Sequence, residues 1–183
     1  PQAPRGNDVE FCDVRFTYEG AEHPALDGVS FRVPAGSTVA LVGPSGGGKT
    51  TAASLVPRFW DADSGSVLVG GVDVREMAPH VLMDDVAFAK LPDGGDTIIG
   101  TRGTYLSGGE QQRIMLARAI LKDAPIVVLD EATAFADPEN ERLIQGAFKR
   151  LAQGRTVIMV AHRLTPVVGA DKIVVLDHGH VVE

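Results

Sequence analysis

The stretch Val39-Ala-Leu-Val42, followed by Gly43-Pro-Ser-Gly-Gly-Gly-Lys-Thr50, decides the fold of this chain. The apolar run predicts a short buried strand, and the residues from Lys49 to Phe59 favour a helix. The segment between them has the pattern G-x-x-x-x-G-K-[ST], which is typical of a phosphate-binding loop (Walker A) when it joins a strand to a helix. Motif and context therefore agree.

The composition of this loop follows from the chemistry of phosphate. Backbone N–H groups must approach the phosphate oxygens closely, and glycines allow this because they have no side chain in the way. We expect the Lys49 ammonium to reach the β- and γ-phosphates and the Thr50 hydroxyl to bind Mg²⁺. The cofactors predicted are ATP and Mg²⁺, with the nucleotide held by Gly43, Pro44, Ser45, Gly46, Gly47, Gly48, Lys49, Thr50 and Thr51.

Further segments place the loop in an α/β fold. Val9–Phe16 predicts a first strand, and Val29–Val33 and Thr38–Val42, separated by a turn, predict an antiparallel edge subsheet. Ile126–Leu129 and Val157–Val160 are continuous apolar runs, typical of strands buried on both faces of a parallel sheet. We therefore predict a P-loop NTPase (RecA-like) core of α/β class, with a mostly parallel sheet and an antiparallel β subdomain.

Two hairpins and one irregular stretch complete the pattern. Ser66–Val69 and Val72–Val74 flank a Gly-Gly turn, and Ile173–Leu176 and His180–Val182 flank a His-Gly turn. Residues 75–104 show little periodicity, which is unusual for so long a segment of a compact domain. A part of the fold is therefore expected to be missing there.

Length and charge limit the function. A chain of 183 residues suits a single domain, which we place at residues 8–183 after a linker at residues 1–7. The formal net charge of -7 offers no basic surface for a nucleic-acid backbone, so no nucleic-acid partner is expected. No apolar run approaches the roughly 18 residues of a membrane span, and any spanning part is expected on other sequence.

Two acids follow the buried run that ends at Leu129. Asp130 and Glu131 stand at the carboxyl end of a predicted parallel strand, where ligands bind in open α/β sheets. Asp130 fits a residue that holds Mg²⁺, and Glu131 fits one that orients or deprotonates an attacking water. The alternative is a pair of solvated acids at the start of a loop.

A second glycine-rich segment, Leu106-Ser-Gly-Gly-Glu110, precedes the helical run Gln111–Leu121. Its serine and glutamate alone could form a capping box. That interpretation leaves the glycines unexplained, because each costs about 1 kcal/mol relative to alanine in a helix. A helix N-terminus with a hydroxyl and bare amides is a phosphate site. Since one loop already holds a nucleotide, we predict a dimer in which Ser107, Gly108 and Gly109 face ATP on a partner subunit.

Taken in chain order, these motifs resemble the nucleotide-binding domain of ABC transporters. The resemblance is carried by the phosphate loop and by Leu106-Ser-Gly-Gly-Glu-Gln-Gln-Arg113, Val127-Val-Leu-Asp-Glu131 and Ala161-His-Arg163. It covers nearly the whole chain. It implies a head-to-tail dimer of two such domains that hydrolyses ATP and drives attached transmembrane domains at the cytoplasmic face of the cell (inner) membrane.

The resemblance also implies individual roles. Tyr18 matches the aromatic residue that stacks on adenine, and His162 matches the histidine that contacts the γ-phosphate. Asp137 lies where the family crosses its dimer interface. Plainer roles stay open: a surface tyrosine at a strand end, a structural histidine, and a helix N-cap before Pro138. Catalysis is then expected from Glu131, His162 and Lys49.

Details around Ala132–Glu139 are similar to exporter-fold half-transporters that import siderophores in actinobacteria. The chain departs from the family after Val86–Phe88, where the usual glutamine and helical subdomain do not follow. Our hypothesis is that a helical segment near residues 88–89 is absent from the printed sequence; a real deletion would leave ATP binding possible and coupling to transport lost. Two other functions are weighed: the ATPase head of a chromosome-maintenance or DNA-repair protein, and a non-hydrolysing regulatory module.

Overall fold

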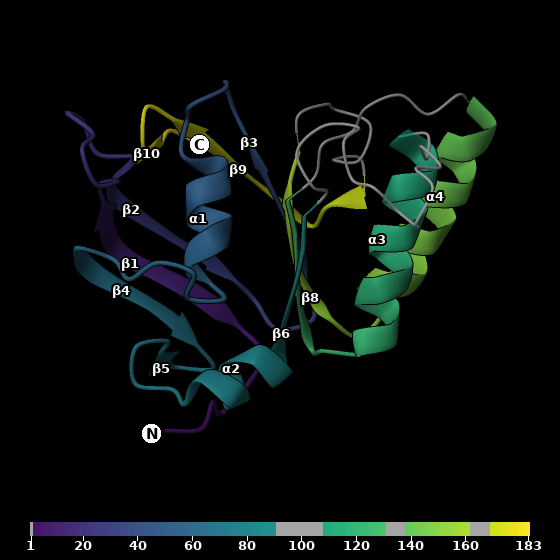
Figure 1. Cartoon of the computed structure of the whole chain (residues 1–183), viewed down its shortest axis with the longest axis horizontal. Helices are drawn as coiled ribbons and strands as arrows, with labels where there is room; N and C mark the ends of the chain where they lie inside the picture. The colour runs from purple at the N-terminus through teal and green to yellow at the C-terminus, as the bar shows by residue number, and fades with distance from the viewer. Residues whose placement is uncertain (1, 91–107, 131–137, 162–168) are drawn as a thin grey trace, which may run out of the picture.

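The computed structural model describes residues 2–90, 108–130, 138–161 and 169–183. Figure 1 shows the arrangement of the elements in space. In chain order they are β1 (Val9–Phe16), β2 (Leu26–Val33), β3 (Thr38–Val42), α1 (Lys49–Leu55), β4 (Ser64–Val69), β5 (Val72–Asp73), α2 (Pro79–Asp85), β6 (Val86–Lys90), α3 (Gly108–Lys122), β7 (Ile126–Asp130), α4 (Pro138–Ala152), β8 (Thr156–Val160), β9 (Lys172–Asp177) and β10 (His180–Val181).

The larger sheet is mostly parallel, as predicted. Its order is β10-β9-β3-β8-β7-β6, and of these pairings only β10 with β9 is antiparallel. Val160 at the end of β8 pairs with Leu41 of β3 on one side and with Asp130 of β7 on the other. The carboxyl ends of these three strands therefore meet at one edge of the sheet.

The prediction that Thr38–Val42 belongs to the antiparallel subsheet is wrong. The smaller sheet has the order β2-β1-β4-β5 and does not include β3, which lies between β9 and β8 in the larger sheet. The physical reason is burial: every residue of β3 except Val42 is buried. A strand that is buried on both faces belongs in the middle of a covered parallel sheet.

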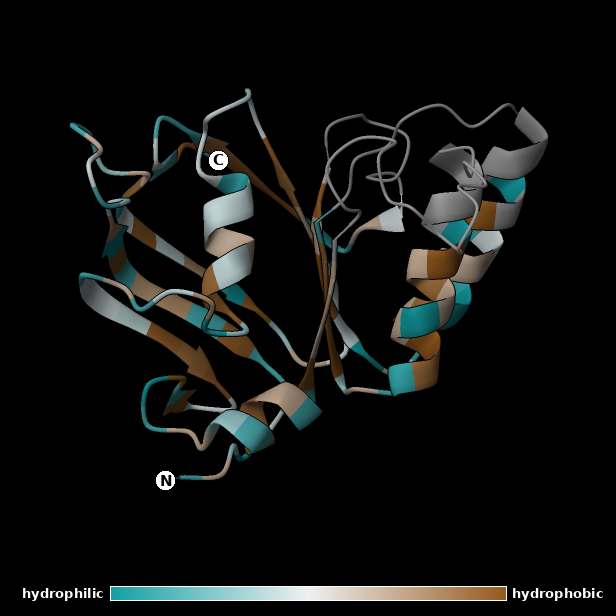
Figure 2. Cartoon of the chain, viewed as in Figure 1, coloured by the Kyte–Doolittle hydropathy of each residue, from teal (hydrophilic) through white to brown (hydrophobic). Residues whose placement is uncertain are grey.

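The continuous apolar runs pack into hydrophobic cores on both faces of the larger sheet. Val128 and Ile158 belong to the core shared with α1 and the smaller sheet, whereas Val127 and Val157 pack with residues of α3 and α4. Successive strand residues point to opposite faces, so a strand between two cores needs apolar residues at every position. Figure 2 shows brown, hydrophobic colouring along the central strands of the larger sheet.

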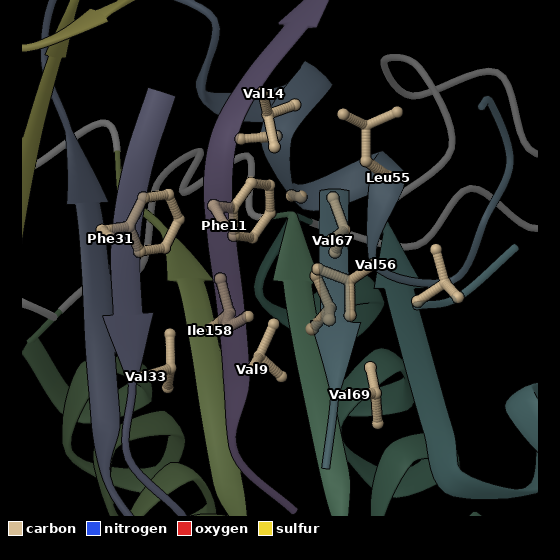
Figure 3. Packing of buried hydrophobic residues seen from close by; sticks show 14 of the residues in the cluster. Val9, Phe11, Val14, Phe31, Val33, Leu55, Val56, Val67, Val69 and Ile158 are labelled. Atoms are coloured by element: carbon tan, nitrogen blue, oxygen red, sulfur yellow. The ribbon is translucent and has the colours of Figure 1, made fainter. Parts of the chain in front are cut away.

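The smaller sheet packs on the larger one through a shared core that contains a pair of stacked aromatic rings. Phe11 of β1 and Phe31 of β2 pair in register, and their rings stack with centroids 4.4 Å apart. Figure 3 shows Ile158 of the larger sheet and Leu55 of α1 in the same cluster. The helix α1 is therefore held between the two sheets (Figure 1).

The helices differ from prediction in two places. The helix expected to reach Phe59 ends at Leu55, because Pro57 has no N–H to donate and Arg58 has a φ of 60°. The irregular stretch contains α2, a seven-residue helix with Pro79 in its first turn that lacks a side-chain cap. Both predicted hairpins are present. Within the described ranges, no helix combines the length and the apolar character needed to cross a bilayer.

Candidate nucleotide-binding site

The glycine-rich loop between β3 and α1 rests on the C-terminal hairpin. The N–H of Gly179, in the turn between β9 and β10, donates to the carbonyl oxygen of Gly47 at 3.2 Å. Gly43 has a φ of 136°, and a Cβ there would overlap the carbonyl oxygen of Leu176 in β9. A Cβ on Gly48 would lie 2.6 Å from the carbonyl oxygen of Ala25. These glycines are therefore required by close backbone packing within the protein as well as by phosphate chemistry.

Lys49 is buried at the start of α1, with 4% of its surface exposed. Its Nζ donates to the carbonyl oxygens of Gly43 at 2.9 Å and Pro44 at 2.6 Å. Burial lowers the pKa of Lys49, and the negative charge of Asp130 opposes that shift. The ammonium is thus held over the loop, next to the place where this motif binds phosphate, by two carbonyl bonds that phosphate oxygens can replace.

Thr50 and Asp130 come together from elements far apart in the sequence. The Thr50 hydroxyl donates to Oδ1 of Asp130 at 3.3 Å. Asp130 is 4% exposed, and its Oδ2 is buried with no hydrogen-bond partner among the residues that the structure describes. A buried carboxylate oxygen with no partner is destabilising unless a cation or water binds it. One carboxylate and one hydroxyl fit Mg²⁺, which takes few protein ligands and completes its shell with phosphate oxygens and water.

Tyr18 reaches the same region from the end of β1. Its hydroxyl lies 2.9 Å from Oγ1 of Thr51, the residue after Thr50 on α1. Its ring makes edge contacts with Phe16 and Trp60, with centroid distances of 4.8 Å and 5.7 Å. Tyr18 keeps 36% of its surface exposed, which leaves room for a ring to pack on it.

Several predicted site residues lie outside the described residues. These are Ser107, Glu131, Asp137 and His162. Their neighbours are described: β7 ends at Asp130, and α3 begins at Gly108, so that Gly108 and Gly109 form its first turn as expected.

Sequence reasoning missed the residues that support the loop. Leu176 and Gly179 lie more than a hundred residues from the loop in the sequence, and no local pattern connects them with it. Trp60 is adjacent to Tyr18 in space, although no motif includes it. Only the order of the strands brings these groups together.

The fold and the loop define a P-loop nucleotide-binding protein. Similarity to known proteins identifies the family within this class. The family model described as "ABC transporter" matches residues 26–89 and 82–134. The chain is 41% identical to the ATP-dependent lipid A-core flippase of Vibrio cholerae over 96% of its length, and 40% identical to that of Burkholderia orbicola over 100%. This chain therefore belongs to the ABC transporter family and corresponds to its ATP-binding domain.

The chain spans only part of these relatives. It covers 38% of the Vibrio cholerae protein, in an alignment over 218 residues, which is more than the 183 residues of this chain. A solved structure titled "Structure of a bacterial Atm1-family ABC exporter with ATP bound" matches with a TM-score of 0.84 and 32% identity. That match covers 100% of this chain and 40% of the exporter chain. These matches confirm the predicted fold and the predicted exporter-type relationship.

Proposed function

We propose that this chain binds ATP together with Mg²⁺ and hydrolyses the γ-phosphate bond. The observation that carries the proposal is the meeting of Lys49, Thr50 and Asp130 at one edge of the parallel sheet. An ammonium, a hydroxyl and a buried carboxylate, one oxygen of which has no partner within the described part of the chain, form the set that a nucleoside triphosphate and its metal ion require. The exporter structure that resembles this chain has ATP bound.

Each residue has a distinct proposed role. Lys49 exchanges its loop carbonyls for phosphate oxygens, while Thr50 and Asp130 would hold Mg²⁺, which would neutralise phosphate charge. Glu131 orients or deprotonates the attacking water, and His162 contacts the γ-phosphate. The chemistry is phosphoryl transfer to water, in which positioning and charge stabilisation provide most of the rate.

The proposed active unit is a head-to-tail dimer. Ser107, Gly108 and Gly109 at the start of α3 are proposed to contact the nucleotide held by a second nucleotide-binding domain, with Asp137 at the interface. The start of α3 at Gly108 supports this, because the first amides of a helix are free to bind an anion. The proposed second domain is either an identical copy or a different chain with the same motifs.

The proposed task of the dimer is to power transport of a solute through attached transmembrane domains, at the cytoplasmic face of the inner membrane. The support is that the relatives are a flippase and an exporter and that this chain covers only 38% and 40% of their lengths. The narrower expectation of a siderophore importer has no support from these relatives, and the transported substrate is left open.

The missing helical segment also stays a proposal. Alignment over 218 residues requires positions that this chain lacks, and the family model matches two stretches that overlap at residues 82–89. The alignment length supports the loss of a segment, and the overlap of the two stretches supports its position near Phe88 and Ala89. The sheet tolerates the junction, since β6 pairs with β7 in unbroken register from Val86 to Lys90.

The test is steady-state ATP hydrolysis by this chain and by Glu131→Gln. We expect hydrolysis that requires Mg²⁺ and whose rate per subunit rises with protein concentration, because the proposed site is shared between two subunits. Glu131→Gln should lose this hydrolysis and still bind ATP. Glu76→Gln, a matched change at an exposed carboxylate, should retain the activity. ATP binding without hydrolysis in the unsubstituted chain would instead favour a non-hydrolysing regulatory module. Binding of the chain to DNA at physiological salt would favour the ATPase head of a chromosome-maintenance protein. The relatives favour neither alternative.

A further inference from the structure

The contact between Tyr18 and Thr51 joins two parts of the site that sequence motifs treat separately. Tyr18 belongs to the segment after β1, and Thr51 belongs to α1, which continues directly from the phosphate-binding loop. Their hydroxyl oxygens are 2.9 Å apart, and either can be the donor. Each hydroxyl has one proton and can accept as well. Whichever of them donates, the pair retains a second proton for another acceptor.

The surroundings of the pair limit how Tyr18 can lie. Phe16 packs against its ring nearly at right angles, at 87°, and Trp60 does the same at 85°. Phe16 and Trp60 also touch each other, with centroids 6.0 Å apart. Edge-to-face aromatic contacts of this kind are directional. They restrict the ring, but Trp60 is itself 51% exposed and is not fixed by burial.

Thr51 is the rigid member of the pair. It is 6% exposed and lies on a helix whose Ala52, Ala53 and Leu55 belong to the core between the two sheets. A hydrogen bond between the hydroxyl of this exposed ring and a buried hydroxyl on the helix fixes the ring relative to that helix. The same helix carries Lys49 and Thr50, so the ring is fixed relative to the phosphate-binding groups.

We propose that Thr51 is a positioning residue for Tyr18, and that the hydroxyl pair sets the ring at the place where it receives the base of the bound nucleotide. This inference rests on the nucleotide site proposed above. It assigns the Tyr18 hydroxyl to recognition of the base, through Thr51, and not to contact with phosphate.

The test compares a ligand that has a base with one that has none. Calorimetry with Mg·ATP and with Mg·tripolyphosphate is carried out on this chain, on Tyr18→Phe, on Thr51→Val and on the double variant. Tyr18→Phe keeps the ring and loses only the hydroxyl. We expect it to weaken ATP binding about two- to tenfold, the range that one net hydrogen bond supplies, and to leave tripolyphosphate binding unchanged.

The pair itself is measured by the double-mutant cycle. We expect the double variant to bind ATP no more weakly than Thr51→Val alone, because the bond can be lost only once. Thr51→Ser, which keeps the hydroxyl, should restore the affinity of the unsubstituted chain. Ser54→Ala is the matched control, because it also removes a hydroxyl from this helix. The Ser54 hydroxyl donates to the carbonyl oxygen of Thr50 at 2.7 Å and makes no hydrogen bond to Tyr18 in the described structure. It should not change ATP affinity.

Trp60 provides an independent signal. It is the only tryptophan of the chain and lies 5.7 Å from Tyr18, so its fluorescence should respond to ATP and not to tripolyphosphate. Additive effects of the two substitutions, or equal weakening of tripolyphosphate binding by Tyr18→Phe, overturn the inference. If the unsubstituted chain binds neither ligand, the proposed function fails and this inference with it. If it binds ATP and Tyr18→Phe binds equally well, only this inference fails. Circular dichroism melting verifies that each variant is folded.

Discussion

Replacing Gly43 with alanine should destabilise the whole chain, because the loop is packed against β9. Gly43 has a φ of 136°, which L residues rarely adopt, and its added Cβ would overlap the carbonyl oxygen of Leu176. That oxygen belongs to the backbone of a strand and cannot rotate away. Gly46→Ala is the matched control: Gly46 also has positive φ, at 78°, but no heavy atom of the described residues lies within 4 Å of its added Cβ.

The expected magnitudes follow from this difference. Gly46→Ala adds only the strain of a left-handed alanine, about 1–2 kcal/mol. Gly43→Ala adds strain of about 1–3 kcal/mol and must also displace either the loop or β9, so we expect a total of about 4 kcal/mol. For a domain of this size each kcal/mol lowers the midpoint of thermal unfolding by about 2–4 °C. The two variants differ by about 2–3 kcal/mol, which corresponds to roughly 4–12 °C.

The assay is thermal unfolding followed by far-UV circular dichroism, with calorimetry of ATP binding on the same preparations. Gly43→Ala should melt well below Gly46→Ala and should bind ATP more weakly, since displacement of the loop moves its amides. Equal melting temperatures for the two variants would refute the packing of the loop on β9.

Other outcomes can be checked in the same way. Asp130→Asn removes the charge beside Thr50, so calorimetry with and without Mg²⁺ should show that the metal no longer strengthens ATP binding; a persistent effect would exclude Asp130 as a metal ligand. Burial lowers the pKa of Lys49, so the unfolded chain holds more protons, and the free energy of unfolding should rise as pH rises toward 10.5. Denaturant titrations of Lys49→Met at increasing pH should show a smaller rise in the free energy of unfolding. An identical pH dependence in this variant would contradict the role of Lys49. Phe11→Ala removes a stacked, buried ring and should lower the free energy of unfolding by about 3–5 kcal/mol, measured in denaturant; a loss below 1 kcal/mol would argue against that core.

Much of the fold could be predicted because its signals are local. The apolar run Ile126–Leu129 indicated a strand covered on both faces, and the structure places β7 between two cores. The Gly-Gly turn predicted the β4–β5 hairpin for a similar reason, since two residues determine how a tight turn is made. The partner strand of Thr38–Val42 could not be predicted, because a turn between two strands does not determine whether they pair. The helix α2 was missed because its seven residues carry no cap or periodic pattern.

In the candidate site, the residues themselves could be predicted from local sequence, whereas their contacts could not. Lys49 and Thr50 were identified from spacing alone, and Asp130 from its position after a buried strand. Their mutual distance was not predictable, since Thr50 and Asp130 meet only because β8 lies between β3 and β7 and aligns the strand ends. Tyr18 was included by resemblance, whereas its bond to Thr51 required the structure.

The sequence by itself determined the residues proposed to contact phosphate, the strands that are buried on both faces and the bounds of the glycine-rich loop. These properties depend on residue type and short spacing, which the chain carries in order. The tertiary structure decided how the site is supported. Leu176 limits Gly43 to glycine, Gly179 binds the loop, and Thr51 holds Tyr18, because strand order brings together residues that the chain keeps far apart. No local pattern encodes such contacts, since each depends on two segments that find each other only in the folded state.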